Sequence, residues 1–203
     1  MKLLLFSDLH RDVDAALRLV ESAKAVDVVI GAGDFANRHQ GLSDTLDVLA
    51  AIEKPAVLVP GNGETFAELR DAAAVWKDAR VLHGSGCQIA GREFWGVGGA
   101  IPVTPFGAWS YDFTEEEAEG MLAGCPRGAI LVVHSPPLQT VDWDSSGRIR
   151  GSRTIRGVVD RLGLGLVACG HIHSDWGKRV DVAGTPVINA GPGGVIVEIA
   201  DCS

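Results

Sequence analysis

Side chains able to bind metal ions stand directly after five apolar stretches of the sequence. Each stretch is short enough to be one buried strand, and a carboxylate, an amide or an imidazole follows it within a few residues. Four of the six histidines belong to this set. Its members are Asp8, His10, Asp34, Asn62, His134, His171 and His173. Oxygen and nitrogen donors without a thiolate are typical ligands of divalent metal ions.

Each of these residues alone has a simpler interpretation. Asp34 could cap the next helix, and His134 could be a hydrogen-bonded histidine near the core. Asn62 followed by Gly63 could form a hairpin turn, but residues 64–76 have helical rather than strand periodicity. Because five separate strand ends share the property, we favour a common metal site over five unrelated coincidences.

The elements that must position these side chains alternate between strand and helix. Strands are predicted at 3–6, 26–30 and 56–59, and helices after Asp12, at 42–52 and at 66–76. Such alternation is typical of a parallel sheet, whose strands deliver ligand-binding residues to one edge. Further strands are predicted at 81–82, 87–90, 93–97, 129–133, 164–168, 178–182, 186–188 and 195–199, and further helices at 114–122 and 152–162. We therefore expect a single α/β domain over residues 1–203, with two sheets.

The donors are too numerous for one tetrahedral zinc ion and suit a pair of divalent ions. Two ions about 3.5–4 Å apart can clamp the attacking and leaving oxygens of a phosphoryl displacement. The net charge of −8 argues against a general nucleic-acid or anionic-membrane binder, which needs a basic face. Bound cations would let an acidic protein attract a small phosphorylated substrate.

These ligands lie in five short blocks: Asp8-Leu9-His10, Gly33-Asp34, Gly61-Asn62-Gly63-Glu64, His134 and Gly170-His171-Ile172-His173. The blocks resemble those of the calcineurin-like metallophosphoesterases, in the same order and over nearly the whole chain. The resemblance implies a four-layer αββα sandwich of two mixed sheets flanked by helices. It further implies two divalent metal ions, with Mn²⁺ favoured and Fe, Zn, Ni or Mg as alternatives, and attack on phosphorus by a metal-bridging hydroxide. By position, Asp8, His10 and His173 would hold one ion, Asn62, His134 and His171 the other, and Asp34 would bridge them, while Asn62 would also position a phosphate oxygen.

The third block departs from the pattern at Gly63, where many family members have a histidine that protonates the leaving group. General acid catalysis contributes about 10²–10⁴-fold, so its loss favours activated leaving groups. His39, five residues after Asp34, is a candidate replacement acid, and a solvated loop residue is the alternative. The prediction is a metal-dependent phosphodiesterase. The alternatives are a phosphomonoesterase and a non-catalytic metal-binding scaffold for protein interaction.

Two further groups of residues are candidates for substrate contact. Arg11, Arg148 and Arg150 could bind phosphate, or could belong to polar surface loops. An aromatic set could line a pocket for a nucleobase or aryl group, or only seal loops over the edge of the sandwich. The aromatic residues are Phe106, Trp109, Tyr111, Phe113 and Trp143.

The cysteines and the apolar segments bear on the compartment. Cys87, Cys125, Cys169 and Cys202 show no paired spacing, so we expect reduced thiols. No segment approaches the ~20 apolar residues of a membrane span, and the first residues do not resemble a signal peptide. The expectation is a cytoplasmic protein, with a homo-oligomer possible.

Overall fold

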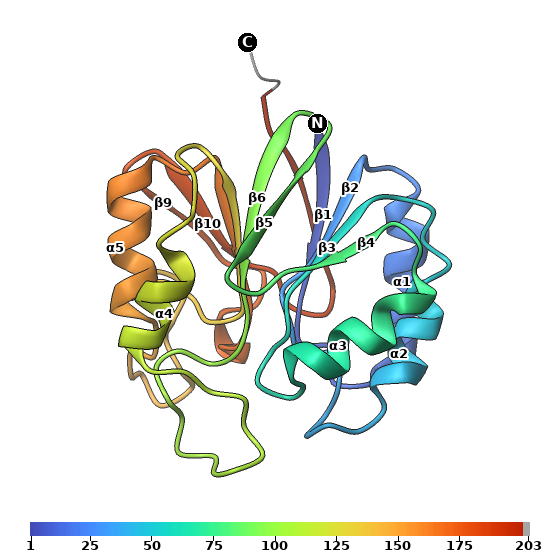
Figure 1. Ribbon diagram of the computed structural model, residues 1–203, viewed down its shortest axis with the longest axis horizontal. Coiled ribbons are helices and arrows are strands. Elements are labelled where there is room, and N and C mark those ends of the chain that lie inside the picture. The colour runs from blue at the N-terminus through green and yellow to red at the C-terminus, as the bar shows by residue number, and fades with distance from the viewer. Residues whose placement is uncertain (201–203) are drawn as a thin grey trace.

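The computed structural model describes residues 1–200 and contains two sheets that face each other (Figure 1). The first has the order β11 (Val195–Glu198), β1 (Lys2–Phe6), β2 (Val28–Gly31), β3 (Ala56–Leu58) and β4 (Ala79–Val81). The second has the order β5 (Ser85–Ile89), β6 (Arg92–Val97), β7 (Ile130–Val133), β8 (Leu166–Cys169), β10 (Thr185–Asn189) and β9 (Arg179–Val182). Both sheets are mixed, because β11, β5 and β9 are antiparallel edge strands on otherwise parallel sheets.

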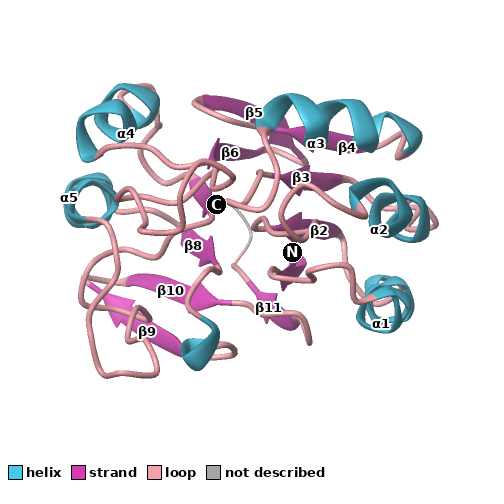
Figure 2. Cartoon of the chain, turned by 90° about the horizontal axis from the view of Figure 1, so that it is seen from below, coloured by secondary structure: helices cyan, strands magenta, loops and turns pink. Residues whose placement is uncertain are grey.

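Helices cover the outer face of each sheet (Figure 2). The first sheet carries α1 (Val13–Ala23), α2 (Leu42–Leu49) and α3 (Phe66–Ala72), and the second carries α4 (Glu115–Leu122) and α5 (Arg153–Leu162). Short 3₁₀ turns are η1 (Ala73–Val75) and η2 (His173–Asp175). Side-chain caps start four of the helices: Asp12, Thr65, Thr114 and Ser152 each accept a first-turn amide.

Alternating side chains of the strands fill three apolar layers. In β1, Leu4 and Phe6 pack towards the helices of the first sheet, whereas Leu3 and Leu5 pack between the sheets. A third cluster lies between the second sheet and its helices. The central strands are therefore buried on both faces, which explains their unbroken apolar runs. The predicted four-layer sandwich is confirmed.

The strand boundaries differ from the predicted ones where pairing decides them. The second strand begins at Val28 rather than Val26, because its pairing with β1 starts at Leu3 opposite Val28. Val26 belongs instead to the turn after α1, where its amide donates to Ala23. After β4 the chain passes from the first sheet to the second. Of the short strands predicted in this region, the one at 81–82 therefore falls in the first sheet, and those at 87–90 and 93–97 fall in the second.

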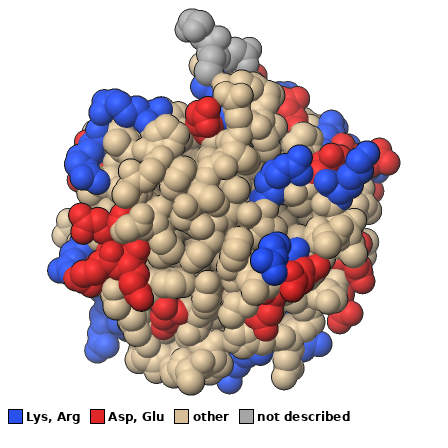
Figure 3. Space-filling model, viewed as in Figure 1, with Lys and Arg blue, Asp and Glu red and all other residues tan. Residues whose placement is uncertain are grey.

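Charged side chains are unevenly distributed over the surface. On the face seen in Figure 3, acidic side chains gather over α4 and basic ones occur in small separate groups. Cys87, Cys125 and Cys169 are free thiols, and Cys202 lies outside the described residues. Within residues 1–200, no helix combines the length and the apolar character needed to cross a bilayer.

Candidate metal centre

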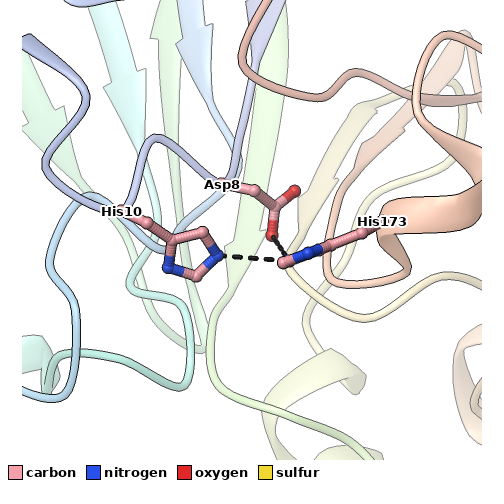
Figure 4. A group of neighbouring side chains, drawn as sticks. All are labelled: Asp8, His10 and His173. Atoms are coloured by element: carbon pink, nitrogen blue, oxygen red, sulfur yellow. Dashed lines mark hydrogen bonds and ion pairs between the residues drawn. The ribbon is translucent and has the colours of Figure 1, made fainter.

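The parallel strands of both sheets end at the same end of the sandwich, the lower end in Figure 1. The loops after β1 and β8 there bring together Asp8, His10 and His173, which we call the open group (Figure 4). The Nε2 atoms of His10 and His173 lie 3.1 Å apart, and His173 Nε2 lies 3.8 Å from Asp8 Oδ1. Side chains separated by more than 160 residues therefore direct donor atoms at one point.

Asp8 is the buried member of the open group and is fixed from several sides. Its carboxylate accepts hydrogen bonds from the Ser7 hydroxyl, the Trp176 indole at 3.2 Å and the His171 amide at 3.0 Å. The backbones of Asp8 and His10 have φ angles of 56° and 45°, in the left-handed region that L-residues avoid. Such strain is held by the surrounding structure and is common at functional sites.

Asn62, His134 and His171 form a second cluster, which we call the closed group. Asn62 Oδ1 lies 3.2 Å from His134 Nε2 and 3.1 Å from His171 Nδ1. His134 Nδ1 lies 2.8 Å from the Ala32 carbonyl, which requires the proton on Nδ1 and leaves the Nε2 lone pair for a metal. Burial, reinforced by the neighbouring histidines, lowers the pKa of His171 well below its usual value and keeps that ring neutral.

Asp34 lies between the two groups. Its Oδ2 is 3.6 Å from His10 Nε2, and its Oδ1 is 3.6 Å from His134 Nε2. Burial, followed by the charge of Asp8, raises the pKa of Asp34 to about 7. An ionised carboxylate in a buried site needs a compensating positive charge, and a divalent cation provides it. The donor set therefore fits a pair of divalent ions with Asp34 between them.

Glu64 is a residue of the site to which the sequence analysis assigned no role. Its fully buried carboxylate accepts backbone amides from Gly61 at 2.7 Å and from Asp34 and Ala36 at 2.9 Å. It thereby ties the loop after β2 to the loop after β3 and fixes the backbones that carry Asp34 and Asn62. Its sequence signal was its place as the acidic residue of the glycine-rich segment Gly61-Asn62-Gly63-Glu64.

A serine distant in sequence orients the amide of Asn62. Asn62 Nδ2 donates to Ser110 Oγ at 3.0 Å, and Ser110 Oγ donates to Asp112 Oδ1 at 2.5 Å. The amide nitrogen is thus turned to Ser110, and the oxygen is turned to the two imidazoles. No local pattern signalled this role, because 48 residues separate the partners.

Five of the seven candidate metal ligands line a cavity of about 550 Å³, namely His10, Asp34, Asn62, His171 and His173. This volume is within the usual range for small-molecule sites. Of the arginines predicted to contact substrate, Arg150 lines it and forms an ion pair with Asp144, Nε to Oδ2 2.7 Å. Arg11 and Arg148 are not among the described residues that line it, and Arg11 packs against Gly41 instead. Arg38, which the sequence analysis did not single out, is the other arginine of the described lining.

The candidate acid His39 has both ring nitrogens engaged. Nδ1 lies 2.9 Å from Glu68 Oε2, and Nε2 lies 2.6 Å from the carbonyl of Trp109. The hydrogen bond to Glu68 raises the pKa of His39 above its ordinary value. The ring faces a separate surface hollow, so this geometry lends no support to proton donation to a substrate, and that role stays a prediction.

The predicted aromatic set divides in two. Phe106 and Trp109 line the cavity, with rings stacked 5.7 Å apart at an interplanar angle of 8°. Tyr111 and Phe113 instead pack around His83, with ring centroids at 5.7 and 5.0 Å. Trp143 is 47% exposed and is not among the described residues of the cavity lining.

Solved structures share this fold. The protein TT1561 of Thermus thermophilus superimposes with a TM-score of 0.76 at 19% identity, covering 95% of this chain and 90% of that one. A dimetal phosphatase of Danio rerio gives 0.62 at 13% identity, covering 95% and 88%. The phosphopantetheinyl hydrolase of Mycobacterium tuberculosis gives 0.61 at 15% identity, covering 94% and 88%.

Comparison by sequence gives two further findings. No curated protein matches the chain. Residues 1–175 match the calcineurin-like phosphoesterase family, and that segment contains the open group, the closed group and Asp34. The chain therefore belongs to the calcineurin-like phosphoesterase family.

Proposed function

We propose that this protein is a metal-dependent phosphodiesterase. The choice of a diester over a monoester rests on how the arginine side chains of the cavity are paired. Of the described lining residues, Arg38 and Arg150 are the cations besides histidine, and Arg150 pairs with Asp144 while Arg38 lies over the Trp109 ring. A phosphodiester carries one negative charge, whereas a monoester near neutral pH carries up to two. Among the described lining residues, Arg38 is therefore the one arginine without an ion pair, and a cavity with a single such cation suits the less charged ester.

The two groups of ligands would hold the ions as the family resemblance implies. Asp8, His10 and His173 would hold one ion and Asn62, His134 and His171 the other, with Asp34 shared. Bound divalent ions would supply Lewis acidity towards the phosphate and lower the pKa of coordinated water. The chain's own contribution is orientation: Glu64 fixes two ligand loops, Ser110 turns the Asn62 amide, and Gly63 N–H donates to Asp34 Oδ1 at 2.7 Å.

Position 63 restricts the leaving group. Gly63 lines the cavity beside Asp34 and offers no side chain to protonate a departing oxygen. A leaving group of low pKa departs as an anion without such help. We therefore expect aryl, enol or phosphoryl leaving groups rather than simple alkoxides.

The test compares bis(p-nitrophenyl) phosphate with p-nitrophenyl phosphate. Protein stripped of metal is assayed before and after separate additions of Mn²⁺, Fe²⁺, Zn²⁺, Ni²⁺ and Mg²⁺. We expect turnover only with added metal, and a kcat/KM for the diester at least about tenfold above that for the monoester. A reversed preference would indicate a phosphomonoesterase. Protein that binds two ions per chain yet hydrolyses neither ester would indicate a non-catalytic metal-binding protein.

A further inference from the structure

The loop after β6 places an exposed aromatic surface in the same cavity as the candidate metal ligands. Phe106 lines the cavity and is 50% exposed, although large apolar side chains are usually covered. Trp109 stacks parallel to it and lines the same cavity, where His10 and His173 also contribute to the wall. The cavity therefore combines a metal-binding wall with a flat aromatic one.

Arg38 adds a planar cation to this aromatic surface. Its guanidinium carbon lies 4.9 Å from the centroid of the Trp109 ring, and Arg38 also lines the cavity. Phe106, Trp109 and Arg38, which we call the platform, offer stacking and cation–π contacts, which planar π-systems satisfy and alkyl groups do not.

Hydrogen bonds fix both ends of the loop that carries Phe106 and Trp109. The Trp109 carbonyl is bonded to His39, and the Tyr111 amide donates to the Asn62 carbonyl at 3.0 Å. Asp112 accepts hydrogen bonds from Ser110 and from both the amide and the hydroxyl of Thr104. Both ends of the loop are thus closed by one carboxylate, and a binding surface ordered in advance loses less entropy when a ligand binds.

We propose that the platform binds a planar aromatic substituent, aryl or nucleobase, of the phosphodiester whose phosphate lies at the metal ligands. This inference rests on the proposed function, because it names the class of substrate for the same site. A bound planar ring would cover the Phe106 side chain, which explains why that side chain is exposed in the protein alone.

The test measures binding rather than turnover. Protein loaded with Mn²⁺ is titrated calorimetrically with monomethyl phenylphosphonate and with monomethyl ethylphosphonate. Both are monoanions with a P–C bond that resists hydrolysis, and their one ester bond has a simple alkoxide as its leaving group. They differ in the ring, which is planar and larger than the ethyl group. Stacking on an aromatic side chain is worth about tenfold in affinity per ring, and we expect the phenyl compound to bind about tenfold more tightly.

Two substitutions test whether the platform causes the preference for the phenyl compound. Phe106→Ala and Trp109→Ala should reduce the phenyl preference towards one, while the affinity for the ethyl compound stays the same. Val103→Ala is the matched control, because Val103 is 58% exposed in the same loop and is not among the described lining residues. The methyl ester of thymidine 5′-phosphate serves as a third probe: tighter binding than the phenyl compound identifies a nucleobase, and weaker binding identifies a simple aryl group.

The result separates this proposal from the proposed function. Equal affinities for the phenyl and ethyl compounds in the unaltered protein, or a preference that survives both platform variants, would overturn the platform. A phenyl preference in a protein that hydrolyses no phosphodiester would retain the platform and refute the enzyme. Phosphodiester hydrolysis without a phenyl preference would do the reverse.

Discussion

The open and closed groups of candidate metal ligands differ in access to solvent. The side chain of His134 is fully buried and Asn62 is 4% exposed, whereas the side chains of His10 and His173 are 30% and 52% exposed. The closed group also has fixed outer partners, namely the Ala32 carbonyl behind His134 and Ser110 behind Asn62. Among the described residues, no hydrogen bond holds the Nδ1 atom of His10 or His173.

With such a difference, one site can hold two ions with unequal affinity. Ligands that are buried and fixed in advance bind an ion tightly and release it slowly, since outer partners are worth about 10–100-fold in metal affinity. Imidazoles that are more exposed and whose Nδ1 atoms lack a hydrogen-bond partner among the described residues should exchange their ion with solvent more easily. We therefore expect a tightly held ion in the closed group and an exchangeable ion in the open group.

Removing the carboxylate that joins the two groups should have the largest effect. Asp34→Asn keeps the shape of the side chain but loses the charge shared between His10 and His134. Loss of one stabilising electrostatic group in an active site costs up to about 10³ in rate, and we expect at least that loss in metal-dependent hydrolysis of bis(p-nitrophenyl) phosphate. Asp47→Asn, on the exposed face of α2, is the control. Activity within tenfold of the unaltered protein would exclude a bridging role.

Substitution of one histidine from each group tests directly whether the two groups bind their ions with unequal affinity. His134→Asn should weaken the tightly held ion by about 100-fold or more, whereas His173→Asn should leave that ion in place and lose the exchangeable one. The measurement is metal content and affinity by calorimetry, with release followed after addition of a chelator. Release from the unaltered protein should be biphasic. A single phase that removes both ions together would show that the two groups are equivalent.

The outer partner of Asn62 should have a smaller effect, confined to the closed group. Ser110→Ala removes the hydroxyl that turns the Asn62 amide, and we expect about a tenfold loss of affinity for the tightly held ion. Ser110→Thr retains the hydroxyl and should restore most of that affinity. If the alanine variant binds both ions normally, the contact between Ser110 and Asn62 does not orient the ligand.

The smallest effect concerns His39, which ties the aromatic loop to α3. The hydrogen bond to Glu68 raises the pKa of His39 above 6.5, so its stabilising contribution is complete below that pH and is lost as the pH rises through the folded pKa. Because the pair is partly exposed, the contribution should be below about 1 kcal/mol. His39→Gln should therefore lower Tm more at pH 5.5 than at pH 8.5. An equal change at both values would show that the imidazolium is not involved.

The candidate metal ligands could be predicted from the sequence because the signals that mark them are local. An apolar run predicts a buried strand, and the residue after it must lie at an edge of the sheet; Asp8, Asp34 and His134 all follow this rule. The helix start at Asp12 was equally readable, since capping depends on residues within one turn.

Which of these residues meet, and which outer partners hydrogen-bond to them, depends on the packing of the two sheets. The order of strands in the two sheets brings His10 to His173 and Asn62 to Ser110 across 163 and 48 residues. It also directs both ring nitrogens of His39 to Glu68 and Trp109 rather than to the cavity. Sequence alone determined the donor atoms and the strand ends that carry them, because both depend on short segments. The inequality of the two ligand groups and the aromatic platform depend on burial and on contacts between distant loops, which exist only once the sheets have packed.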